Sequence, residues 1–385
     1  MKQMFMIEPG LIFLNHGSFG ACPKPVLDRY QAWQREVEQN PVEFLSRKSG
    51  ELLYESRYAL ATYLNVNASD LAFVTNSTTG VNIVARSLRL KPGEEVITSD
   101  HEYGACDNIW EHICKAQGAK YKKVTIPLPF NPKTFVDTIL KAVTEKTRII
   151  FLSHVTSATA LIFPLGELCE MARNRNIITV IDGAHAPAFI DLNLDDLEAD
   201  FYTGNCHKWL CAPRGSAFLY VRPEHHHLVE SNVISWGYSE ASEESNEHVA
   251  YTGSSILERR LQWLGTRDIS AFLTVPFAIA FQNENNWAGL RKKCCMLAVD
   301  TMQEICSILG SQPVCSSHVL GQMVVIPIPP IDPFYLKWTL FEQYRIEIPV
   351  TAHGQNLFLR LSVQAYNSAE ELEILKKAVK KIFSK

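Results

Sequence analysis

Long hydrophobic runs are missing from this chain of 385 residues. No run approaches the roughly 20 consecutive apolar residues that a membrane-spanning helix needs. The apolar start is broken by Glu8, Pro9 and Gly10, which argues against a signal peptide. We therefore expect no association with a membrane.

An excess of positive charge is also missing, since the formal net charge is -4 at pH 7. Nucleic acids and anionic membrane surfaces are bound largely through clustered lysine and arginine, so neither is an expected partner. Small molecules are the expected ligands.

The ten cysteines follow no recognisable pattern, because they are scattered and no Cys-x-x-Cys spacing occurs. Scattered cysteines are typical of reduced thiols in a cytoplasmic protein, and not of a zinc site or a disulfide framework. The three histidines at 225–227 favour a solvated loop over a metal site. We expect a cytoplasmic location and no bound metal.

Strand-like and helix-like segments alternate between about residues 70 and 221. Apolar and β-branched runs predict strands at 71–75, 95–98, 147–153, 177–181 and 216–221. The segments between them predict helices at 80–88, 104–117, 132–143 and 165–175. This alternation predicts an α/β fold with a largely parallel sheet and helices on both faces.

The order of elements changes after about residue 225 and predicts a second, α+β unit. Helices are expected at 270–283, 287–309, 333–344 and the C-terminus, and strands at 322–328 and 357–362. The polar stretch 239–248 is either a linker or a loop at the mouth of an active site. We predict an N-terminal segment (1–20) that contributes to the active site and the small domain, a large cofactor-binding domain (21–250) and a small C-terminal domain (251–385).

Two residues carry the strongest chemical signal. Asp182 ends an apolar strand, and Lys208 follows in the apolar surroundings of Cys206 and Trp209. An enzyme holds pyridoxal phosphate (PLP) with such a pair: the lysine forms a Schiff base, and the carboxylate keeps the pyridine nitrogen protonated. Either residue alone has an ordinary explanation, as a turn aspartate or a surface lysine.

Polar side chains elsewhere would complete such a site. The segment 75–80 follows a strand and opens a helix, which suits a phosphate but also a plain helix cap. His185 is either a hydrogen-bond partner of the cofactor's phenolic oxygen, an acid or base, or structural. Arg360 lies inside an apolar strand and needs an anion, either a substrate carboxylate or an internal partner.

Four motifs together resemble the class V aminotransferase family of fold-type I PLP enzymes, and within it the isopenicillin N epimerase-like branch. They are Phe-Leu-Asn-His-Gly-Ser-Phe-Gly at 13–20, Asp-His-Glu-Tyr-Gly-Ala at 100–105, Thr-Gly-Asn-Cys-His-Lys at 203–208 and Gly-Thr-Arg-Asp at 265–268. The resemblance spans nearly the whole chain. It implies a mostly parallel seven-stranded sheet flanked by helices, a small α+β C-terminal domain, and a homodimer with active sites at the interface.

The resemblance also implies roles for single residues. Lys208 would carry PLP, Asp182 would pair with its ring nitrogen, and His185 and Tyr103 are the other catalytic candidates. Tyr103 is the first candidate for stacking on the cofactor ring, and His101 is the competing one. The phosphate would be held by residues near the two loops and by a neighbouring subunit, namely Ser77, Thr78, Thr79, Asn205, His207 and Thr266.

For the substrate, the resemblance implies that Arg360 binds the α-carboxylate with help from Asn15 and His16. Ser157 stands where cysteine desulfurases of the family carry an asparagine close to the cofactor and the substrate. The stretch 348–356 contains no cysteine where those enzymes carry their nucleophile, which argues against persulfide-forming chemistry.

The expected activity is a reaction at Cα of an amino acid through an external aldimine, with Lys208 as the base. The branch makes epimerisation the first expectation. The alternatives are C–S β-lysis of the cysteine desulfhydrase type and transamination, and a non-catalytic PLP-binding protein is the remaining reading. The shared residues do not rank these outcomes.

Overall fold

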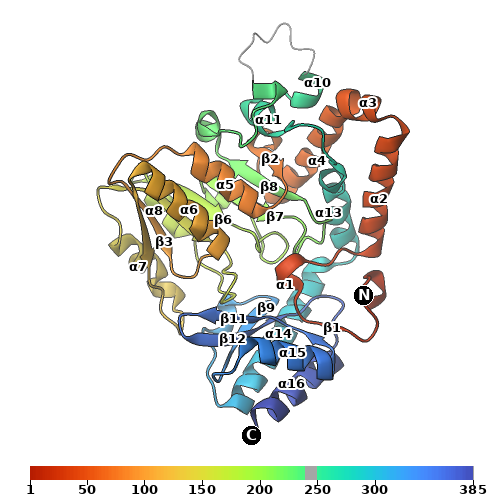
Figure 1. The fold of residues 1–385 in the computed structure, drawn as a ribbon, viewed down its shortest axis with the longest axis vertical. Coiled ribbons are helices and arrows are strands. Elements are labelled where there is room, and N and C mark those ends of the chain that lie inside the picture. The colour runs from red at the N-terminus through yellow and green to blue at the C-terminus, as the bar shows by residue number, and fades with distance from the viewer. Residues whose placement is uncertain (239–248, 385) are drawn as a thin grey trace.

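The computed structural model describes residues 1–238 and 249–384, so the polar stretch 239–248 lies outside the described residues (Figure 1). A seven-stranded sheet runs through the centre in the order β2-β8-β7-β6-β5-β3-β4. Its strands are β2 (Leu71–Val74), β3 (Glu95–Ser99), β4 (Lys120–Val124), β5 (Thr147–Ser153), β6 (Ile178–Asp182), β7 (Phe201–Asn205) and β8 (Ala217–Val221).

The sheet is mostly parallel, as predicted. Strands β4, β3, β5, β6 and β7 pair in parallel, and β8 runs antiparallel to both β7 and β2. The sequence prediction missed two strands of this sheet. Strand β4 is an edge strand rich in lysine, and β7 ends in Gly204 and Asn205. The composition of each strand therefore departs from that of a usual buried strand.

Helices cover both faces of the sheet because side chains alternate along each strand. In β2, Leu71 and Phe73 join the apolar cluster on one face, whereas Ala72 and Val74 join the cluster on the other. The first cluster includes residues of α4 (Ser49–Leu64), α7 (Phe135–Lys141) and α8 (Gly166–Arg173). The second includes residues of α5 (Ser77–Ser87), α6 (Gly104–Gln117) and α11 (Ile256–Leu261).

Further helices precede the sheet or follow it in the chain. Helices α12 (Ser270–Leu273) and α13 (Val275–Glu284) pack against α2 (Lys24–Gln39) and α4. They replace the single helix predicted at 270–283, because Pro276 in the first turn of α13 has no N–H to continue α12. Short helices complete this part, namely α1 (His16–Phe19), α3 (Pro41–Glu43) and α10 (Val249–Thr252), and the short α9 (Leu194–Leu197) lies between β6 and β7.

The C-terminal elements gather at one end of the molecule, drawn in blue in Figure 1. A three-stranded antiparallel sheet in the order β11-β12-β9 forms their centre. The elements are α14 (Trp287–Leu309), β9 (Met323–Ile328), α15 (Pro333–Tyr344), β10 (Ile346–Glu347), β11 (Val350–His353), β12 (Asn356–Ser362) and α16 (Ala369–Phe383). The N-terminal strand β1 (Ile12–Phe13) pairs in parallel with β10. The N-terminal segment is therefore paired with the C-terminal elements.

Within the described residues, no helix is both long and apolar enough to cross a membrane. The predicted division of the chain at residue 250 stays a proposal.

Candidate active site

A cavity of about 490 Å³ lies at the carboxyl ends of β5, β6 and β7, which is where parallel α/β sheets bind their ligands. Ten of the residues predicted from the sequence line it, namely Ser77, Thr78, Tyr103, Ser157, Asp182, His185, Asn205, His207, Lys208 and Arg360. The sequence analysis gave no role to seven others, namely Gly17, Ser18, Phe19, Asn76, Ser153, Val155 and Ala184.

Asp182 is the last residue of β6 and is buried at the cavity. One carboxylate oxygen accepts a hydrogen bond from the backbone N–H of Ala184 (2.9 Å), and the other accepts one from the thiol of Cys106 (3.5 Å). Burial raises the pKa of Asp182, and these bonds and the Lys208 amine act in the opposite direction. A cationic ring nitrogen placed against this carboxylate would compensate its buried charge.

Lys208 points at His185, with 3.1 Å between its Nζ and Nε2 of the imidazole. The indole N–H of Trp209 donates to Nδ1 of His185 (3.3 Å). Because an indole N–H can only donate, Nδ1 is the acceptor and the ring proton is assigned to Nε2. Burial lowers the pKa of His185 well below its usual value, so the ring is neutral and offers an N–H.

When neutral, the Lys208 amine can accept a hydrogen bond from this N–H of His185. Burial lowers its pKa to about 8, while the nearby Asp182 charge acts in the opposite direction. A substantial share of the amine is therefore neutral near physiological pH, as imine formation requires. His185 fits a hydrogen-bond donor to the cofactor's phenolic oxygen better than it fits a base.

The start of α5 fits the phosphate. Asn76 caps the helix through the backbone N–H of Thr79 (2.8 Å), and Asn205 accepts from the backbone N–H of Ser77 (2.9 Å). The buried hydroxyl of Ser77 has no hydrogen-bond partner among the described residues. An unsatisfied hydroxyl at a helix N-terminus is suited to a phosphate oxygen.

His207 also lines the cavity, but the neutral state of its ring limits the predicted contact with the phosphate. Its Nδ1 lies 3.0 Å from the carbonyl oxygen of Ser216, to which it donates, and burial lowers its pKa to about 4. The neutral ring then has only an acceptor at Nε2. A hydrogen bond to phosphate from this nitrogen requires that the dianion raise the pKa of His207.

Arg360, on β12, is only 5% exposed. Its guanidinium donates to the backbone carbonyl of Ser157 (2.7 Å) and to the hydroxyl of Ser18 (2.8 Å), and its Nε has no partner. A third, longer bond goes to the hydroxyl of Ser157 (3.2 Å). All of these acceptors are neutral, and no carboxylate pairs with Arg360 within the described residues. Burial lowers its pKa to about 10, so the charge remains at neutral pH and calls for an anion.

The N-terminal segment forms one wall of the cavity. Gly20 packs tightly against the loop that carries Lys208: its φ is +68°, and a Cβ there would lie 1.9 Å from the carbonyl oxygen of His207. His16 lies behind this wall, with Nε2 3.0 Å from the carbonyl oxygen of Lys208 and Nδ1 3.0 Å from the hydroxyl of Tyr366. Neither His16 nor Asn15 lines the cavity, so both would act on the substrate only through their neighbours.

Thr79, Thr266 and His101 are likewise absent from the cavity lining. The contact predicted for Thr266 requires a neighbouring subunit and stays a prediction. His101 is held away from the cavity, because Nε2 donates to the carbonyl of Ile126 (2.9 Å) and Nδ1 lies 2.8 Å from the hydroxyl of Thr159. Tyr103 is 48% exposed at the cavity wall, which favours it for stacking on the cofactor ring.

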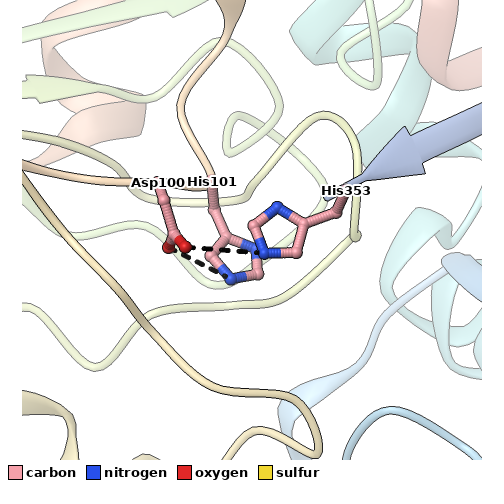
Figure 2. A group of neighbouring side chains, drawn as sticks. All are labelled: Asp100, His101 and His353. Carbon is pink, nitrogen blue, oxygen red and sulfur yellow. Dashed lines mark ion pairs between the residues drawn. The ribbon is translucent and has the colours of Figure 1, made fainter. Parts of the chain in front are cut away.

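Figure 2 shows His101 with Asp100 and His353, a group with the composition of a metal site. The two imidazole rings stack with centroids 3.8 Å apart and planes at 22°, so their lone pairs lie side by side and do not converge on one point. The carboxylate of Asp100 is 3.6 Å from His101 and 3.7 Å from His353. This geometry suits a contact between the sheet and the C-terminal elements better than a metal centre.

The residues at the cavity fit PLP: a lysine of lowered pKa, a carboxylate at a strand end, an unsatisfied hydroxyl at a helix N-terminus and an unpaired arginine. Fold and site together define a PLP-dependent enzyme. The chain belongs to the class V aminotransferase family, whose family model, described as aminotransferase class-V, matches residues 12–375.

Comparisons with individual proteins agree with this family. The chain is 36% identical to an isopenicillin N epimerase from Amycolatopsis lactamdurans, over 99% of this chain and 97% of the relative. It is 28% identical to a probable chloroplastic L-cysteine desulfhydrase from Arabidopsis thaliana, over 97% of this chain and 83% of the relative. A solved structure of a C-DES mutant with glycine linked to the PLP cofactor has a TM-score of 0.82 at 20% identity, over 99% of each chain.

Proposed function

We propose that this enzyme removes the Cα proton of an amino acid and restores it on the opposite face, as an amino-acid epimerase. The observation that carries a reaction at Cα is that one cavity holds the Lys208 amine of lowered pKa and the unpaired charge of Arg360. Arg360 binds the substrate carboxylate, and Lys208 takes the proton. PLP, when bound, supplies the electron sink that makes this proton acidic.

Epimerisation requires a second group that returns a proton from the other face. His185 is poorly suited, since Trp209 occupies Nδ1 and the N–H at Nε2 faces the lysine. Tyr103 lines the cavity and is partly exposed, so we assign it the second role. The 36% identity to isopenicillin N epimerases supports this reaction.

The second candidate is C–S β-elimination, which needs Lys208 but no acid on the opposite face. Its support is the likeness to probable and putative L-cysteine desulfhydrases. The cavity lining of the described residues includes no cysteine. Persulfide formation on the protein therefore has no nucleophile there.

The test gives PLP-loaded protein a panel of L- and D-amino acids that includes cysteine and its thioethers. Stereoinversion, followed by chiral chromatography, is the expected result. For Tyr103→Phe we expect a loss of inversion of about 100-fold, in the range of a lost general acid, with Cα exchange retained. Pyruvate and a free thiol without inversion would replace the epimerase with the lyase.

We further propose a cytoplasmic homodimer in which Thr266 of one subunit reaches the phosphate of the other. Sedimentation of the loaded protein tests the dimer. Thr266→Ala should weaken PLP binding at unchanged subunit mass, and a monomer with full activity would contradict the proposal.

A further inference from the structure

Glu102 is a buried acid that the proposed chemistry does not use. It lies in the turn between β3 and α6, directly before Tyr103, and is 9% exposed. One carboxyl oxygen bonds to the hydroxyl of Ser99 (2.6 Å). The other accepts from both the backbone N–H (2.8 Å) and the hydroxyl (2.6 Å) of Ser153. Both oxygens are therefore committed to neighbouring strand ends.

The sheet itself shows why Ser153 needs this partner. Pairing between β3 and β5 stops at Ile97 and Ile150, whereas pairing between β5 and β6 continues to Ser153 and Asp182. The last residues of β5 thus have a neighbour on one side only. The Glu102 carboxyl replaces the missing strand at the N–H of Ser153, and a buried N–H without a partner would be costly.

The hydrogen bonds of Glu102 link two parts of the cavity wall. Ser153 lines it and is the register neighbour of Asp182, and Tyr103 lines it from the residue after Glu102. One turn further along α6, Cys106 donates to Asp182. We propose that Glu102 is a positioning residue that holds Ser153 beside Asp182 and fixes the turn that presents Tyr103 to the cavity. The inference rests on the proposed function, because it concerns the same cavity.

Burial raises the pKa of Glu102 to about 8, and the Asp182 charge adds to this effect against the opposing serine bonds. Near pH 7 the group is mainly a neutral acid that donates one hydrogen bond and accepts others. Glutamine has the same shape and the same mixture of donor and acceptor. Glu102→Gln should therefore preserve the connection, whereas Glu102→Ala removes it.

The experiment compares wild type, E102Q and E102A, each loaded with PLP, with Glu111→Ala, an exposed position on the following helix α6, as the control. The readouts are kcat and KM for the amino-acid substrate and the visible circular dichroism of bound PLP. For E102A we expect kcat to fall at least about 10-fold, as for a small misplacement of reacting groups, with KM unchanged and a clearly altered dichroism band. E102Q should stay within about 2-fold of wild type.

The inference is overturned by an E102A protein with wild-type kcat and dichroism, or by E102Q as impaired as E102A. A loss of thermal stability alone, with both readouts unchanged, also overturns it. If E102A does not fold, Ser99→Ala removes one of the three bonds, and the same kcat-selective loss is expected at about 3-fold. Failure of the proposed function is distinguishable, because the dichroism comparison needs no turnover.

Discussion

The two sides of the cavity are built differently. On the cofactor side, Asp182, His185 and Lys208 lie at the carboxyl ends of the adjacent parallel strands β6 and β7, and local backbone or ring contacts fix these side chains. On the substrate side, Arg360 meets Ser18 and Ser157, which lie 342 and 203 positions away in the chain. The ends of the sheet strands position most of the cofactor side, whereas the substrate side forms only when the N-terminal segment and the C-terminal elements pack against the sheet.

The two sides also depend on different interactions. The cofactor side depends on strand ends whose positions are set by the core of the sheet. The substrate side depends on three hydrogen bonds made by one guanidinium. Substitutions on the two sides should therefore have separable effects, on cofactor attachment and on substrate binding.

The largest expected effect is on the cofactor side. Lys208→Ala should abolish the borohydride-trapped bond between protein and PLP, and should lower activity at least about 1000-fold, because both the attachment point and the base are lost. Absorbance and mass spectrometry check the attachment, with the exposed Lys133→Ala as control. A trapped adduct that persists at an unchanged position would contradict the account.

A smaller and separate effect is expected on the substrate side. Arg360→Ala should raise KM for amino-acid substrates by about 100-fold, the order of a lost charged hydrogen-bond pair, while the affinity for PLP stays the same. Steady-state kinetics and PLP titration measure the two quantities, and Arg345→Ala, which alters a partly exposed ion pair with Glu8, is the control. An unchanged KM would make Arg360 structural and remove the contrast between the two sides.

The pKa of Lys208 predicts how cofactor loading depends on pH. In protein freed of PLP, the neutral amine fraction should rise about tenfold per pH unit below pH 8 and level off above it, because only the neutral amine attacks the aldehyde. Rates of loading between pH 6 and 9 test the direction. A rate that keeps rising towards the ordinary lysine pKa, about 10.4, would show that burial does not lower the pKa of this amine.

The cofactor side was largely predictable from the sequence. On the substrate side, Arg360 and Ser157 were predicted and line the cavity, but the contact between Arg360 and Ser18 was not predicted. Strand ends of a parallel sheet meet at one edge, so Asp182 and Lys208 could be placed together before the fold was known. The bounds of α6, α14 and α15 also match their predictions. Nothing in the local sequence near Ser18 indicates a contact with Arg360.

Side-chain direction and protonation also escaped prediction. His101 and Tyr103 are two positions apart, yet the bonds to Ile126 and Thr159 turn only His101 away from the cavity. The assigned His185 tautomer depends on a hydrogen bond from Trp209, 24 positions later. Glu102 can bond to Ser153 because the pairing between β3 and β5 stops before Ser153. Sequence patterns do not encode where such pairing stops.

Solvent exchange at Cα tests the central claim most directly. PLP-loaded protein is incubated in deuterium oxide with a panel of L- and D-amino acids, and deuterium at Cα is followed by proton NMR, with the Lys208→Ala variant alongside. The account predicts deuterium at Cα of at least one amino acid with the wild type and none with the variant. Wild-type protein that carries PLP on Lys208 and exchanges no amino acid would contradict it.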